Sequence, residues 1–171
     1  ALRLNAEGPL VGAPLPRSFS AAFNPVATAR AEGVAMVTAL GQPVSYTQIH
    51  ASARHLVHRM SGLMKPDAPA VAVLSARTVE CVAAQLACFL GGWTFVPLDP
   101  AWPLARVVQV LAAAKPSIVL TQTPALAAAV ASATSAHGVA TMALGDLLTA
   151  PTGDATEAPL PALARDPAYL I

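Results

Sequence analysis

The sequence predicts an α/β fold with a mostly parallel sheet and flanking helices, and three observations lead to this prediction. From residue 70 onward, short apolar runs alternate with longer segments whose apolar residues recur at helical spacing. The connections between these segments are about two to six residues long, as right-handed βαβ crossovers require. The apolar runs also lack the polar alternation of a one-sided sheet, which is typical of strands buried on both faces.

The N-terminal third is expected to contain a lead-in, a helix and a hairpin. Residues 1–17 contain three prolines and predict a lead-in or linker. Ser18 is expected to cap a helix that Pro25 interrupts. Residues 34–40 and 44–46 predict the two arms of a small hairpin around a Gly-Gln-Pro turn.

A long helix follows the hairpin, with Thr47 as its predicted cap and Gly62 and Pro66 as its predicted stop. Its apolar residues recur at i, i+4, i+7, i+8 and i+11, which places them on one buried stripe. They are Ile49, Ala53, Leu56, Val57 and Met60.

The remaining residues carry the βαβ alternation. The expected strands are 70–74, 93–98, 117–121 and 138–144, and the expected helices are 78–90, 104–114 and 124–134, with a short helix at 146–148. A proline-rich loop over 151–161 leads to Tyr169-Leu170-Ile171, which the pattern predicts as the start of another strand.

The composition excludes some classes of function. Charged residues make up 11% of the chain, against about 25% in a typical soluble protein. The net charge is +1 and the arginines are isolated along the chain, so we expect no nucleic-acid binding, which needs several cations on one face. Residues 81–98 carry no charge, but Gln85, Gly91-Gly92 and Pro97 divide them into a helix, a turn and a strand. We therefore expect no membrane span.

The two cysteines predict a reducing compartment. Cys81 and Cys88 lie on one face of the expected helix, but about 10 Å apart along its axis. That separation is too long for a disulfide, so both are expected to be small core residues. A cytoplasmic location is the corresponding expectation.

No motif in the sequence predicts catalytic or binding chemistry by itself. Neither a dinucleotide-binding nor a P-loop glycine pattern is present. Gly91-Gly92 precedes a strand, so it is read as a helix stop and not as a phosphate cradle. His55 and His58 are spaced to share a helix face, which leaves zinc as an alternative to a solvated face, but no Cys, Asp or Glu lies beside them.

The acidic residues are too sparse for a catalytic pair. Glu80 is expected in the first turn of its helix, where a carboxylate complements the helix dipole. Asp99 is expected to cap the helix that begins after Pro103. The residues alone therefore predict no catalytic, cofactor-binding or metal-binding position in this chain.

Residues 91–106, Gly-Gly-Trp-Thr-Phe-Val-Pro-Leu-Asp-Pro-Ala-Trp-Pro-Leu-Ala-Arg, carry a resemblance to a known family. They resemble a core motif of adenylate-forming enzymes, in particular the amino-acid adenylation domains of nonribosomal peptide synthetases, where the pattern is roughly L-K-A-G-x-A-Y-V-P-L-D-P-x-Y-P-x-E-R. Residues 43–49 resemble the family's L-[TS]-Y-x-E-L motif, and 77–80 its R-S-x-E. Residues 166–171 resemble the strand that leads into its phosphate loop.

The motif departs from the family pattern at Leu90, Trp93, Trp102 and Ala105. A tryptophan in the proline box also occurs in some reductase-type and stand-alone acyl-activating relatives. The proline-rich corner itself is expected to be a rigid joint that Trp102 covers, and to touch no substrate.

The resemblance implies that residues 18–171 are the N-terminal part of an adenylation domain, ending before the phosphate loop. The family uses ATP and Mg²⁺ to convert a carboxylic acid into an acyl adenylate, which is transferred to a phosphopantetheine or coenzyme A thiol. Its catalytic and ligand-binding positions would follow residue 171. The implied partners are the remainder of the adenylation domain and a carrier-protein domain, and this chain alone is expected to be inactive.

Two other readings stay open at this stage. A truncated relative could serve as a non-catalytic partner-binding module or as half of a split enzyme, which predicts a stable fold by itself. An unrelated flavodoxin-like ligand binder would need a phosphate-binding loop after a strand, and the sequence shows none.

Overall fold

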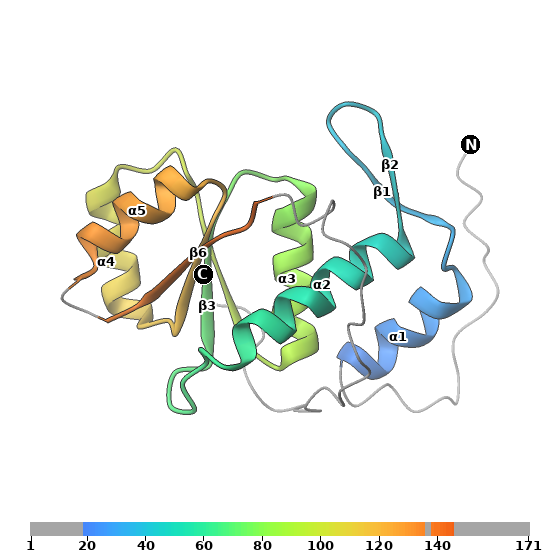
Figure 1. Ribbon diagram of the computed structural model, residues 1–171, viewed down its shortest axis with the longest axis horizontal. Coiled ribbons are helices and arrows are strands. Elements are labelled where there is room, and N and C mark those ends of the chain that lie inside the picture. The colour runs from blue at the N-terminus through green and yellow to red at the C-terminus, as the bar shows by residue number, and fades with distance from the viewer. Residues whose placement is uncertain (1–18, 136–137, 146–171) are drawn as a thin grey trace, which may run out of the picture.

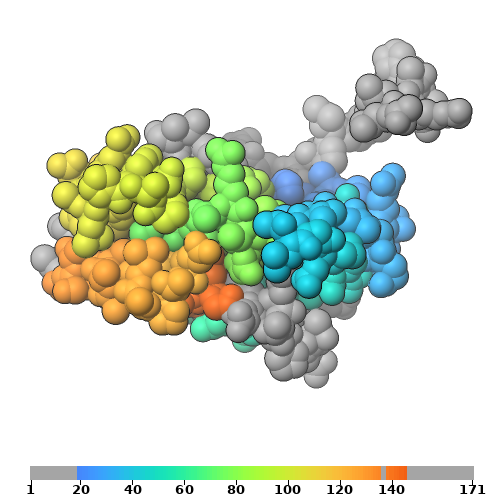
Figure 2. All heavy atoms as spheres, turned by 90° about the horizontal axis from the view of Figure 1, so that it is seen from above, coloured from blue at the N-terminus to red at the C-terminus, as the bar shows by residue number. Residues whose placement is uncertain are grey.

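The computed structural model describes residues 19–135 and 138–145. Figure 1 shows a sheet with helices on both of its faces, and a further helix and hairpin to one side. Viewed from above, α4 and α5 lie side by side at one end, while α1 and the hairpin lie at the other (Figure 2). The predicted lead-in over 1–17, the Ser18 cap, the helix at 146–148, the loop over 151–161 and the strand at 169–171 lie outside the described residues.

The helices and strands follow the predicted order, with boundaries shifted by a few residues at most. They are α1 Phe19–Ala29, β1 Val34–Val37, β2 Pro43–Ser45, α2 Tyr46–Ser61, β3 Ala70–Leu74, α3 Val79–Gly91, β4 Thr94–Leu98, α4 Leu104–Ala114, β5 Ile118–Thr121, α5 Pro124–Ala133 and β6 Ala140–Ala143. Pro25 lies inside α1 without ending it.

The main sheet is parallel, with strand order β4-β3-β5-β6. The chain moves from β3 to β4 in one direction and then crosses back past β3 to reach β5. Right-handed crossovers in opposite directions place their helices on opposite faces, so α3 covers one face and α4 and α5 the other. The predicted α/β class and parallel sheet are confirmed, and β1 and β2 form the predicted antiparallel hairpin.

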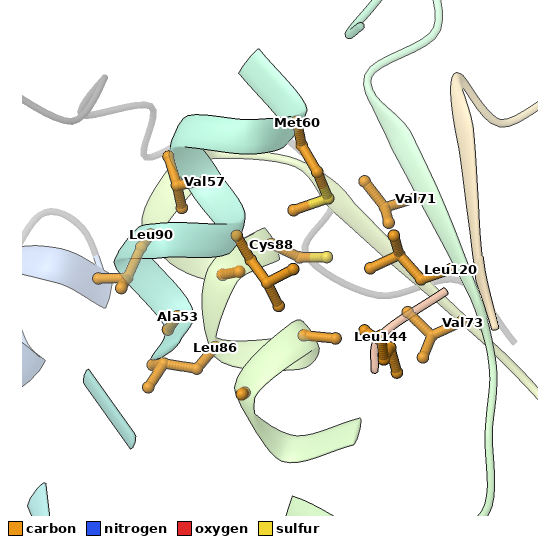
Figure 3. Close-up of a cluster of buried hydrophobic side chains, with 14 of the residues drawn as sticks. Ala53, Val57, Met60, Val71, Val73, Leu86, Cys88, Leu90, Leu120 and Leu144 are labelled. Atoms are coloured by element: carbon orange, nitrogen blue, oxygen red, sulfur yellow. The ribbon is translucent and has the colours of Figure 1, made fainter. Parts of the chain in front are cut away.

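Two apolar clusters hold the helices against the sheet. All five residues of β3 are buried, and alternate side chains enter opposite clusters. Val71 and Val73 join the cluster beneath α2 and α3, whereas Ala72 and Leu74 join the cluster beneath α4 and α5. Figure 3 shows the first cluster, with Met60 of α2 directed toward the strands.

Helix α2 begins two residues earlier than the sequence predicts, because its N-cap is Ser45 and not Thr47. The Ser45 hydroxyl accepts from the Gln48 backbone N–H at 3.2 Å, and the Gln48 side chain accepts from the Ser45 N–H at 2.8 Å. This reciprocal pair is a capping box. Thr47 lies inside the helix, and its hydroxyl donates to the Ala31 carbonyl at 2.9 Å.

Gly92 ends α3 in the left-handed conformation, with φ 70° and ψ 30°, so the predicted glycine stop is confirmed. Its N–H donates to the Cys88 carbonyl. A residue with a Cβ pays a steric cost in this region, whereas glycine does not. The chain therefore reverses sharply and enters β4 two residues later.

Pro97 is tolerated inside β4 because of its register. The Thr94 N–H donates to the Pro69 carbonyl at 2.8 Å, which turns the backbone of Thr94 toward β3. Alternate residues of a strand face opposite sides, so the backbone groups of Phe95 and Pro97 point away from β3. The missing N–H of Pro97 thus falls on the side of β4 that faces away from β3, at the end of the described sheet, and costs no bond to β3.

The corner after β4 corrects the predicted role of Asp99. The Asp99 carboxylate accepts from the Ala101 N–H at 2.8 Å, while the N-cap position of α4 is Pro103 and receives no side-chain cap. Asp99 therefore stabilises the turn and not the helix, because α4 begins at Leu104, three residues after the Ala101 N–H that Asp99 binds. Trp102 packs against the second cluster, with the Arg106 guanidinium 4.3 Å from its ring centre.

Aromatic contacts attach α1 to the rest of the fold. The ring of Phe19 lies 5.1 Å from that of Phe89 on α3, and Phe23 meets the imidazole of His50 on α2 edge-on at 5.7 Å. The Nε2 atom of His50 is buried and has no hydrogen-bond partner among the described residues. Burial, and secondly the positive charge of Arg54, lower the pKa of His50 below its ordinary 6.5.

We expect Gly92→Ala to lower the free energy of unfolding by about 1 kcal/mol, because alanine must adopt the left-handed conformation there. Gly62→Ala is the matched control, since Gly62 also ends a helix but has φ −73° and no atom within 4 Å of an added Cβ. It should be neutral or stabilising by up to about 1 kcal/mol. Urea unfolding measures both, and equal losses would contradict the assignment.

We expect His50 to make the stability depend on pH. Its folded-state pKa is lowered, so the unfolded chain binds the proton more readily, and stability should fall as the pH drops from about 6.5 toward the folded-state pKa. Above pH 7 the effect should vanish because both states are neutral. Urea midpoints of the native chain and of His50→Phe between pH 5 and 8 test this, and parallel curves for the two proteins would refute it.

Candidate functional site

The first candidate site is the point where the strand order reverses, between the carboxyl ends of β3 and β5, because doubly wound sheets bind ligands there. The two loops at this point bond to each other. The Ala76 N–H donates to the Gln122 side-chain carbonyl at 3.3 Å, and the Gln122 N–H donates to the Leu74 carbonyl at 3.2 Å. The switch point is therefore closed by the chain's own polar groups.

The amino end of α3 lies at the same edge of the sheet, after the carboxyl end of β3. The Thr78 hydroxyl accepts from the Cys81 N–H at 3.4 Å and caps the helix. Glu80 lies in the first turn, as predicted, where its negative charge complements the helix dipole. The Cys81 N–H is already bonded to Thr78, and the Glu80 carboxylate would repel a phosphate. This helix end is therefore a poor phosphate site.

A cleft of about 1070 Å³ runs along the outer side of β4. Helix α3 contributes Cys81 and Gln85 to its wall, and α4 contributes residues such as Gln109 and Val110. The sequence did not predict this cleft, because nothing local to residues 94–98 indicates that β4 lies at the end of the described sheet.

The cleft contains few groups capable of chemistry. Its charged residues lie where the cleft meets the carboxyl ends of β3 and β4, and they are exposed: Arg77, Asp99 and Arg106. Burial, followed by the charge of Glu80, raises the pKa of the Cys81 thiol, so this sulfur stays protonated near neutral pH. The cleft offers apolar surface and a few polar contacts, and no activated nucleophile.

The described residues bring no three His, Cys, Asp or Glu side chains together for a metal ion. His55 is half-buried and His58 exposed on α2, and no third ligand joins them within the described part. The zinc alternative thus gains no support there. In the same part of the chain, no helix combines the length and the apolar character needed to cross a bilayer.

The buried cysteines behave as core residues. Cys88 is fully buried in the cluster between α2, α3 and the sheet, and burial raises its pKa. Cys81 is half-buried at the edge of the same cluster, and both thiols are free.

Sequence comparison places relatives among peptide synthetases. The isonitrile lipopeptide synthase of Streptomyces coeruleorubidus is 33% identical over 114 residues, which cover 66% of this chain and 8% of that protein. The probable non-canonical nonribosomal peptide synthetase CymA of Salinispora arenicola is 32% identical over 160 residues, 92% of this chain and 2% of that protein. This chain thus spans less than a tenth of the length of these relatives.

Structural comparison shows a common fold. Apo MatB from Rhodopseudomonas palustris superposes with a TM-score of 0.68 at 22% identity, over 80% of this chain and 28% of MatB. The N-terminal subdomain of Klebsiella oxytoca NpsA, in complex with 3-hydroxyanthranilyl-AMSN, gives a TM-score of 0.64 at 19% identity, over 85% of this chain and 34% of that one.

The sequence profile of the AMP-binding enzyme family matches residues 23–171. The match covers every described element from the second turn of α1 to β6. It includes the proline-rich corner that carried the resemblance. The chain belongs to the AMP-binding enzyme family.

Proposed function

We propose that this chain forms the N-terminal part of an AMP-forming ligase, which activates an amino acid as its acyl adenylate with ATP and transfers it to a thiol. The observation that carries this proposal is the family match over residues 23–171, together with relatives that are peptide synthetases. The thiol would belong to phosphopantetheine on a carrier-protein domain or to coenzyme A. The remainder of the adenylation domain would be the first partner.

The described residues act as a scaffold in this proposal. Their polar side chains are engaged in caps and turns, as at Ser45, Thr78 and Asp99. No three His, Cys, Asp or Glu side chains gather among these described residues, and we propose that residues elsewhere in the polypeptide hold ATP and the metal. The chain by itself is accordingly proposed to be inactive.

The test is amino-acid-dependent exchange of pyrophosphate into ATP. An antibody raised against residues 19–135 would retrieve the native polypeptide from its source, for assay with a panel of amino acids beside the isolated 171-residue chain. We expect exchange with at least one amino acid by the retrieved protein and none by the isolated chain. Exchange by the isolated chain would overturn the scaffold role, and a retrieved protein that is inactive with every amino acid of the panel would favour a non-catalytic partner-binding module.

The proline-rich corner is proposed to affect stability and not substrate binding. Trp102→Ala removes a half-buried ring from the second cluster and should cost about 1–3 kcal/mol of unfolding free energy. Trp102→Tyr should cost less, because it keeps most of the apolar contact. Arg106→Ala removes only the cation over the ring and should cost about 0.5–1 kcal/mol.

The same three substitutions are then introduced into the full-length polypeptide that the antibody identifies. They should leave its KM values for ATP and amino acid within about twofold of the native values. Urea unfolding and exchange kinetics give the two readouts. A large KM change for a variant that remains folded would place the corner in a binding site.

A further inference from the structure

Helix α1 depends on its neighbours for its helical structure. It contains 11 residues and lies at the periphery of the fold (Figure 1), and isolated helices shorter than about 12–15 residues are marginal in water. Pro25 in its interior supplies no N–H to the helix and weakens it further. Ala27 is the one α1 residue that is buried. We therefore expect α1 to be helical only while it is docked.

The interface that docks α1 is aromatic and incompletely packed. Phe19 contacts Phe89 of α3, and Phe23 contacts Tyr46 and His50 of α2, with ring centres 5.1–6.4 Å apart. A groove of about 490 Å³ stays open between α1, β1, α2 and α3. Unfilled space forfeits dispersion contacts along the interface, so the docking free energy is expected to be small.

Release of α1 would leave the rest of the described fold in place. The buried members of both apolar clusters all lie outside α1, and Phe23 packs against the first cluster as a partly buried residue. The sheet and the helices that cover it therefore keep their packing when α1 is undocked. Local openings of this kind cost less free energy than global unfolding.

His50 meets Phe23 at this interface. Its Nε2 is buried and has no hydrogen-bond partner among the described residues. Protonation makes both ring nitrogens donors, so the docked ring would hold a charge and an Nε2–H without an acceptor. Attraction of the charged ring to the face of Phe23 would act in the opposite direction, but the lowered pKa of His50 indicates that burial outweighs it.

In the described part of the chain, no acidic residue offsets a charge on His50. α1 and both hairpin strands contain no charged residue, and Glu80 of α3 lies in the first turn of that helix. Arg54, one turn after His50 on α2, adds a positive charge that disfavours a second one. The other titratable residues of α2, of α3 and of the turn after α1 are Arg30, Glu32, Tyr46, His55, His58, Arg59, Cys81 and Cys88. Since the pKa of His50 is lowered, these groups together do not offset its burial.

We propose that protonation of His50 releases α1, which unfolds locally and uncovers an apolar surface on α2, α3 and β1 at mildly acidic pH. Above about pH 7 the imidazole is neutral and α1 docks. In the released state the ring is hydrated and binds a proton more readily, so each step down in pH from about 6.5 favours release. The residues uncovered are Ala35, Met36, Tyr46, Ile49, Leu86 and Phe89.

Amide hydrogen exchange in the 171-residue chain tests the release, expressed as protection factors that remove the intrinsic pH dependence of exchange. At pH 7.5 the amides of α1 should be at least about tenfold less protected than those of β3, because they open without global unfolding. Between pH 7.5 and 5.5 the protection of α1 should fall about threefold, and by no more than about tenfold, the limit that the ordinary histidine pKa sets.

Two variants without a titrating group and one matched control identify the residue responsible. His50→Phe and His50→Asn should abolish the fall in α1 protection, whereas His58→Phe, at an exposed position on the same helix, should leave that fall unchanged. A fall that persists in both His50 variants would overturn the proposal, and so would α1 amides as well protected as those of β3.

A second measurement follows the uncovered surface. Ala35→Cys places a thiol in the groove, and Ala112→Cys places one at an exposed position of α4, both in a Cys81→Ser background. The Ala112→Cys rate corrects for the thiolate content at each pH. The ratio of the two reaction rates with dithiodipyridine should be about threefold higher at pH 5.5 than at pH 7.5, and independent of pH once His50→Phe is added. A ratio that is independent of pH while His50 is present would contradict the release.

This inference does not rest on the proposed ligase activity. Both measurements use the chain without ATP or an amino acid, so an inactive parent polypeptide leaves them interpretable. Pyrophosphate exchange by the retrieved protein, in turn, does not depend on whether α1 opens at pH 5.5. The two proposals therefore fail separately.

Discussion

Burial of β3 on both faces is the constraint on which the rest of the described fold depends. Its five residues are all buried, and their alternation divides the apolar side chains of the protein into two clusters. Each cluster needs its own layer of helices, which a chain of right-handed crossovers supplies only if it leaves β3 in one direction and returns past it. The order β4-β3-β5-β6 satisfies that requirement.

Polar side chains form hydrogen bonds at both ends of the β3–β5 strand pair. At the amino end, the Ser117 hydroxyl donates to the Ala68 carbonyl and accepts from the Lys65 N–H at 2.9 Å. At the carboxyl end, Gln122 bonds to the loop after β3. Buried or loop polar groups need such partners, because leaving them unpaired costs free energy. At the carboxyl end, these bonds engage the Ala76 N–H and the Gln122 side chain at the switch point, which supports the proposed scaffold role of this part of the molecule.

The proline-rich corner shows how the scaffold and the family resemblance are connected. The backbone of Pro97 faces away from β3, the Asp99 carboxylate holds the turn, and Trp102 packs against the second cluster. Each residue has a mechanical reason to be there that does not involve a substrate. Such a corner can identify a family while contributing no chemistry, which is consistent with the proposal that ATP is held elsewhere in the polypeptide.

The sequence by itself determined the features that arise within a few residues of one another. Apolar spacing located the helices and strands of the described part, and Gly92 marked the end of α3, because periodicity and left-handed backbone conformations are local properties. Local reasoning went wrong where two residues competed for one role. Ser45 and Thr47 are both residue types that cap helices, and only the reciprocal bond between Ser45 and Gln48 shows which of them caps this one.

Only the tertiary structure decided the strand order, the position of β4 at the end of the described sheet and the cleft beside it. These features depend on pairings between residues far apart in the chain, such as Val71 with Phe95 and with Ile118, for which a single sequence gives no local signal. The buried Nε2 of His50 depends on tertiary packing in the same way, since its lack of a hydrogen-bond partner among the described residues reflects how α1 packs on α2. Local spacing determines which residues form an element, whereas packing between distant elements determines what each one faces.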